Sequence, residues 1–130
     1  SMVLHHKEKF LTFIKKHKLR LKKIRDYFNK ILSNSENKLG IYIPLRMITY
    51  LSLLKISNFK NIRFFDDDKG SYNKYYDGFP IIIENFDDLK KNPPNFLLIA
   101  SYSFSELLSS KVKNNIKKDI NLKTLNDFSD

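Results

Sequence analysis

Phe96-Leu97-Leu98-Ile99-Ala100 is the stretch that decides the fold of this 130-residue chain. It is apolar at every position, and Pro93-Pro94 stands shortly before it. A strand without polar side chains must be covered on both faces, which is typical of the centre of a parallel sheet. We therefore expect helices on both sides of this strand.

Short β-branched and aromatic runs predict four further strands, over residues 39–43, 61–65, 80–83 and 119–124. Helical segments are predicted between them, from Pro44 to near Ser57-Asn58, over 86–91 after an Asn85 cap, and from a Ser103/Glu106 capping box to about Lys118. Strands that alternate with helices imply right-handed crossovers. The predicted fold class is α/β, a small three-layer Rossmann-like domain with four or five mostly parallel strands.

The net charge of +10 lies mainly at the start of the chain, because residues 1–40 carry 11 basic and 3 acidic side chains. Three segments are expected: a cloning remnant and disordered start over 1–6, a basic amphipathic helix with its linker over 7–37, and the Rossmann-like domain over 38–130. In the helix, a seam of period 3.5 runs through Phe10, Ile14, His17, Leu21, Ile24, Phe28 and Ile31.

Several partners fit this long basic N-terminal helix. It can pack on the following domain or on a second copy, bind another protein through the residue 10–31 seam, or lie on nucleic acid or an anionic membrane. Nucleic acid is disfavoured as a specific ligand, because lysine dominates over arginine and no nucleic-acid motif accompanies the run.

Several classes are excluded or disfavoured. No cysteine is present, so disulfides, thiolate metal sites and a cysteine nucleophile are excluded. The three glycines are too far apart for a phosphate-binding glycine loop. No transmembrane run or signal peptide is recognisable, and a cytoplasmic location is expected. No catalytic constellation, metal site or cofactor motif is readable.

Ligands of such sheets bind outside the carboxyl ends of the strands. The candidate contacts at these ends are Arg46, Asp66, Ser101, Tyr102 and Ser103. The loop after the second strand adds Lys69, Lys74 and Tyr75, which could neutralise phosphates or stack on a base, although this loop could equally pack on the sheet. The run Asp66-Asp67-Asp68 is compatible with a divalent cation, but a solvated acidic turn is favoured.

The same residues resemble a known family. Phe65-Asp66-Asp67-Asp68-Lys69, Lys74-Tyr75-Tyr76-Asp77-Gly78, Pro80-Ile81-Ile82, Phe86-Asp87-Asp88-Leu89 and Pro94–Ala100 followed by Ser103-Phe104 are similar to the C-terminal Rossmann-like domain of bacterial sugar C-methyltransferases. They are also similar to N-terminal nucleotide-binding-like domains of polysaccharide-biosynthesis enzymes. The resemblance covers residues 8–126. The family's glycine-rich first turn is replaced here by Pro44-Leu45-Arg46.

This resemblance implies an accessory domain that helps to form a sugar-nucleotide site, without the preceding S-adenosylmethionine domain. The sequence thus predicts a non-catalytic binding module linked to nucleotide-sugar or surface-polysaccharide metabolism. The alternatives are a protein-interaction or oligomerisation module with an empty crevice and, third, a weak nucleic-acid binder that uses the basic helix.

Overall fold

The computed structural model describes residues 2–54, 56 and 59–128. Its centre is one five-stranded, all-parallel sheet with the strand order β3-β2-β1-β4-β5. The strands are β1 (Leu39–Tyr42), β2 (Ile62–Phe65), β3 (Ile83–Glu84), β4 (Phe96–Ile99) and β5 (Asn121–Thr124). The predicted α/β Rossmann-like fold is confirmed, and the apolar 96–100 run lies inside the sheet as β4.

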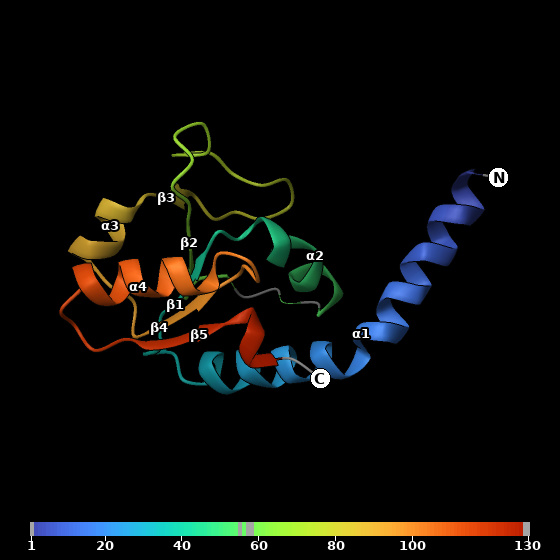
Figure 1. Ribbon diagram of the computed structural model, residues 1–130, viewed down its shortest axis with the longest axis horizontal. Coiled ribbons are helices and arrows are strands. Elements are labelled where there is room, and N and C mark those ends of the chain that lie inside the picture. Colours follow the sequence, from blue (N-terminus) through green and yellow to red (C-terminus); the bar gives the residue numbers. More distant parts are fainter. Residues whose placement is uncertain (1, 55, 57–58, 129–130) are drawn as a thin grey trace.

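Helices cover both faces of the sheet and complete three layers (Figure 1). They are α1 (Met2–Leu32), α2 (Leu45–Leu53), α3 (Phe86–Lys91) and α4 (Ser105–Asn115), and a short 3₁₀ helix, η1 (Leu125–Phe128), follows β5. α1 and α2 share one apolar core with Ile41 and Leu98, whereas α3 and α4 share the other with Leu97. Successive strand residues therefore point into different cores, as the pleat of a sheet requires.

The sheet is tightest at Gly40 in β1. A Cβ placed there would stand 2.8 Å from Phe65 Cε2, 2.9 Å from Leu97 Cδ1 and 2.9 Å from Pro94 Cγ. Real Cβ atoms do not come this close to other atoms, so the first strand needs glycine for packing.

α1 begins earlier than the basic helix that was predicted to start at residue 7. It begins at Met2, and so residues 2–6 are helical rather than disordered. Neither proline nor glycine stands before Lys7 to interrupt the helix. Its second half packs on the sheet through Ile24, Phe28 and Ile31, which are buried. This half of the predicted seam is therefore occupied within the chain itself.

Other element boundaries also differ from the expectations, among them the start of β5, which is Asn121 and not residue 119. β3 begins at Ile83 rather than at Pro80, because residues 73 and 74 exchange backbone hydrogen bonds with Ile83 at 2.9 Å each. α4 ends at Asn115 and not near Lys118. The predicted end of the second helix, Ser57-Asn58, lies outside the described residues.

Candidate functional site

The candidate site is the carboxyl edge of the sheet between β1 and β4. These two strands are hydrogen-bonded neighbours, with Tyr42 opposite Ile99 at their ends. The chain leaves β1 for α2 on one face and leaves β4 for α4 on the other. Such a divergence of neighbouring connections is the point where open α/β sheets bind ligands.

The turn after β1 is built without glycine. Ile43 has a φ of 57°, in the left-handed region that β-branched residues seldom adopt. Pro44 follows, and α2 begins at Leu45 without any side-chain cap. Leu45 is 64% exposed at this helix start. Arg46 lies in the first turn of α2, and its side chain is outside the described part of the structure.

The turn after β4 differs from the predicted capping box. The Ser101 hydroxyl accepts a hydrogen bond from the Phe104 backbone N–H at 3.0 Å, so this serine shapes the turn. α4 then begins at Ser105, and Ser103 lies before the helix, exposed. The Ser103/Glu106 capping box is wrong, because the N-cap position falls on Phe104, which has no side chain able to cap.

Two helix N-termini thus begin at the ends of neighbouring strands, and neither has a side-chain cap in the part of the chain that the structure describes. The first backbone N–H groups of a helix have no partner within the helix and carry a partial positive charge. This arrangement suits an anion such as a phosphate group.

Tyr102, which was predicted to contact a ligand, is bound by a side chain of the protein. Its hydroxyl accepts a hydrogen bond from Arg20 Nη1 at 2.6 Å, and the Arg20 guanidinium stacks 4.9 Å from the centre of its ring. Burial, followed by a hydrogen bond with Tyr102, raises the pKa of Tyr50 to about 12. Tyr102 therefore ties the turn after β4 to α1 and α2.

Sequence reasoning did not identify Arg20 as a site residue. Its Nε also donates to the Phe128 carbonyl, 3.3 Å away. Within the described residues Arg20 forms no ion pair. A half-buried cation therefore stands beside Tyr102. The sequence shows this arginine as one of many basic residues of α1, and only the fold distinguishes it.

The three consecutive aspartates after β2 have different hydrogen-bond partners. The Asp66 carboxylate accepts the Asp68 backbone N–H at 2.9 Å. The Asp68 carboxylate accepts from Gly70 N–H and from the Ser71 hydroxyl, each at 3.0 Å. These bonds make the acidic turn that the sequence favours. The described residues contain no cluster of three side chains able to hold a metal ion.

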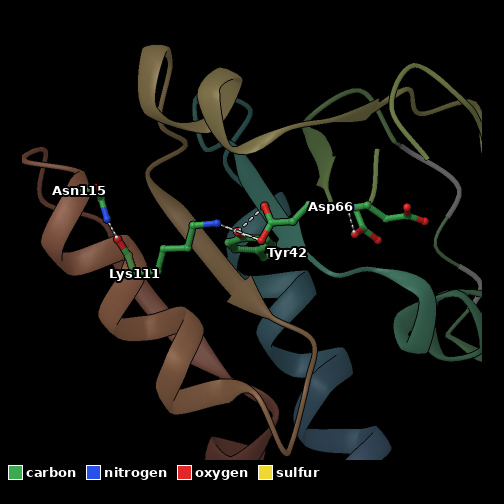
Figure 2. Close-up of polar contacts among 6 residues, drawn as sticks. Tyr42, Asp66, Lys111 and Asn115 are labelled. Carbon is green, nitrogen blue, oxygen red and sulfur yellow. Dashed lines mark hydrogen bonds and ion pairs between the residues drawn. The ribbon is translucent and has the colours of Figure 1, made fainter. Parts of the chain in front are cut away.

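Asp67 belongs to a polar cluster on the α4 side of the sheet. The buried Tyr42 donates its hydroxyl to the Asp67 carboxylate at 2.7 Å, and Lys111 of α4 forms an ion pair with Asp67 at 3.0 Å. Figure 2 shows Lys111 reaching from α4 toward Tyr42. The Lys111 ammonium also lies 4.2 Å from the centre of the Phe86 ring.

The cluster keeps Tyr42 protonated. Burial first, and then the hydrogen bond to Asp67, raise the pKa of Tyr42 well above its ordinary value. A phenol in this state donates a hydrogen bond and does not act as a base. A tyrosine that ends a buried strand requires a partner for its hydroxyl, and this was the sequence signal that could have found the cluster.

The structure does not bring Lys74 and Tyr75 to the crevice. Residue 74 pairs through its backbone with Ile83 of β3, two strands away from β1. Tyr75, 59% exposed, lines a separate open hollow with Arg63 and Glu84. Lys69 is exposed in the acidic turn. Tyr76 and Phe79 of the same loop pack on Phe64, and so the alternative that this loop packs on the sheet is confirmed.

No protein-family model, curated protein or solved structure matches the chain. The resemblance to the C-terminal domain of sugar C-methyltransferases remains a prediction from short motifs.

Proposed function

We propose that the chain is a non-catalytic module that binds a phosphate-bearing small molecule, of the nucleotide or nucleotide-sugar class, at the carboxyl edge between β1 and β4. The observation that carries this proposal is the pair of N-termini of α2 and α4. These helices follow the neighbouring strands β1 and β4, and neither N-terminus has a side-chain cap among the described residues. A bound phosphate would supply the negative charge that a capping carboxylate supplies elsewhere.

Two arginines near this edge support the same ligand class, and the acid in the first turn of α4 is Glu106. Among the described residues the Arg20 guanidinium has neutral partners, the hydroxyls of Tyr102 and Tyr50 and the Phe128 carbonyl. An arginine with remaining donors can contact a phosphate through two parallel hydrogen bonds. Sequence position adds Arg46, in the first turn of α2.

A full dinucleotide is a poorer candidate. Its pyrophosphate normally lies against a glycine-rich first turn, where the backbone can approach closely. Here Ile43 and Pro44 occupy that turn, and proline has no N–H to donate. A mononucleotide or its sugar conjugate, which makes fewer demands on the turn, fits better. The sugar part of the proposal rests on the motif resemblance.

The absence of catalysis is proposed from the Tyr42 cluster. Tyr42 at the end of β1 forms a polar cluster with Asp67 and Lys111 on the α4 side, and the three groups bond one another. A general base must be free to accept a proton from a substrate. Asp67 instead already accepts a hydrogen bond from Tyr42 and pairs with Lys111.

Calorimetric titration tests the proposal, with uridine diphosphate and its sugar conjugates as probes. The informative variant is Leu45→Glu, because a carboxylate on the first residue of α2 competes with a phosphate for the same N–H groups. Ile82→Glu is the matched control, since Ile82 is also an exposed apolar residue, 44% accessible, but lies in the loop before β3.

We expect the wild-type chain and Ile82→Glu to bind alike, and Leu45→Glu to bind about tenfold more weakly or not at all. Unfolding of the ligand-free Leu45→Glu variant should require about 0.3–1 kcal/mol more free energy, because an acid suits a helix N-terminus. Absence of heat with every probe, or equal binding by all three proteins, contradicts the proposal.

A further inference from the structure

The first part of α1 stands apart from the rest of the molecule. Every residue from 2 to 12 is exposed, whereas Ile24, Phe28 and Ile31 in the same helix are buried. Figure 1 shows the N-terminal half of α1 projecting away from the sheet. The packing of the sheet therefore does not require these residues.

This projecting part is nevertheless apolar along one side. Val3, Phe10 and Ile14 are separated by seven and four residues, so they follow one another along one side of the helix, and Leu11 lies next to them. Val3 is 80%, Phe10 45% and Leu11 54% exposed. Large apolar side chains that gather on an exposed helix face indicate an interaction surface.

The same part of the helix is strongly basic. Residues 2–19 carry five lysines, at positions 7, 9, 15, 16 and 18, against one acid, Glu8. Lys7 stands three and four residues before Phe10 and Leu11, and Lys18 stands four residues after Ile14. Residues three or four apart are neighbours on a helix surface, so both lysines lie on the apolar side. Their long aliphatic stems can lie along an apolar surface while the ammonium groups reach outward.

We infer that the exposed face of residues 2–19 of α1 is a docking surface for an anionic lipid bilayer and lies in the plane of its headgroups, while Phe13 on another face of the helix packs on Tyr50. This occupant uses both features of the surface, since the apolar side chains enter the boundary of the acyl chains and the lysines meet lipid phosphates and carboxylates. The helix lies on the bilayer rather than across it. Among the described residues no helix is long and apolar enough to cross a membrane.

A second copy of the chain or a nucleic acid would match only the apolar side chains or only the lysines of this surface. Two copies of the helix would bring their lysines together, and this repulsion opposes pairing along the apolar side. Nucleic acid would attract the lysines, but it leaves Val3, Phe10 and Leu11 without a partner. Charge complementarity together with the apolar side therefore favours the bilayer.

Vesicle co-sedimentation of the full chain tests this inference. The vesicles are phosphatidylcholine alone and phosphatidylcholine with about one-third phosphatidylserine. Phe10→Ser/Leu11→Ser removes apolar side chains, and Lys7→Gln/Lys18→Gln removes charge. Lys113→Gln/Lys117→Gln is the matched control, because both lysines are exposed elsewhere, at the end of α4 and just after it. Thermal unfolding of every variant verifies that the fold is kept.

The wild type and the control should bind the anionic vesicles and leave the neutral ones. The double lysine variant should bind about thirtyfold more weakly, because each basic residue near the surface contributes about 1 kcal/mol. Phe10→Ser/Leu11→Ser should lose about tenfold or more.

Three outcomes overturn the inference. The first is that anionic vesicles do not retain the wild type. The second is that Phe10→Ser/Leu11→Ser binds them like the wild type, as in attraction by charge alone. The third is a dimer in sedimentation that this variant converts to a monomer, together with no vesicle binding, which would make a second copy the occupant.

Discussion

Gly40 is the residue at which the sheet leaves no room for a side chain. Gly40→Ala would place a methyl group against Phe65, Leu97 and Pro94 at 2.8–2.9 Å. Such overpacking should lower the free energy of unfolding by about 1–3 kcal/mol, measured by urea denaturation. Gly70→Ala is the control, because its Cβ would meet the Asp68 side chain at 3.4 Å or more. Equal stability of Gly40→Ala and the wild type contradicts the packing described here.

Tyr50 gives the molecule an alkaline pH dependence. Its pKa is raised to about 12 in the folded chain, against 10.0 ordinarily. The unfolded chain therefore loses this proton first, and the contribution of Tyr50 to stability is complete below pH 10 and is lost as the pH rises toward 12. Tyr42 and Tyr27, whose pKa values burial also raises, act in the same direction.

Thermal unfolding between about pH 8 and pH 11 measures this effect. Tyr50→Phe should be less stable than the wild type at pH 8, because it lacks the hydrogen bond to Tyr102. It should then lose less stability on going to pH 11. The exposed Tyr75→Phe should follow the wild-type curve, and a Tyr50→Phe curve parallel to the wild type would contradict the assignment.

The partners of single side chains were the hardest feature to predict from the sequence. The Phe104 N–H donates to the Ser101 hydroxyl and α4 begins beyond Ser103, and a capping motif inferred from spacing cannot show which serine is used. Likewise, Tyr42, Asp67 and Lys111 are far apart in sequence and meet only after the sheet and α4 have packed. Residue type indicates what a group can bond, but the fold decides which partner it finds.

α1 is an element with two different halves. The sequence seam is uniform, whereas the buried residues Ile24, Phe28 and Ile31 lie in the C-terminal half, and Phe13 packs partly buried against Tyr50 of α2. Phe28→Ala should therefore lower the free energy of unfolding by about 3–5 kcal/mol in urea denaturation, because Phe28 is fully buried. Phe10→Ala, in the exposed half, should change it by less than about 0.5 kcal/mol. A similar loss in both variants would contradict this division of the helix.

Elements with local signals were predicted well. α3 spans the predicted residues 86–91, because Asn85 and Asp88 form a reciprocal capping box within the segment. β3 was misplaced because its position depends on pairing with β2 at Phe64 and Phe65 and with the loop residues 73–74. These partners are set by the fold and not by the apolar run itself.

At the scale of the whole molecule, the alternation of strands and helices was sufficient to predict the parallel sheet. The connection from β2 to β3 is the exception, because a loop whose aromatic residues Tyr76 and Phe79 pack on the sheet replaces the crossover helix. The same packing holds Lys74 and Tyr75 away from the edge between β1 and β4. The residues predicted as ligand contacts therefore lie in two separate places, some at the edge between β1 and β4 and others in the loop before β3.

An anion held between the starts of α2 and α4 is the central feature of the proposed function. The most direct measurement is a map of backbone amide chemical shifts in the full chain as uridine diphosphate is added. We predict saturable shifts centred on residues 45–47 and 101–107. Unchanged spectra, or shifts confined to the loop over residues 72–82, would contradict a phosphate site at this edge of the sheet.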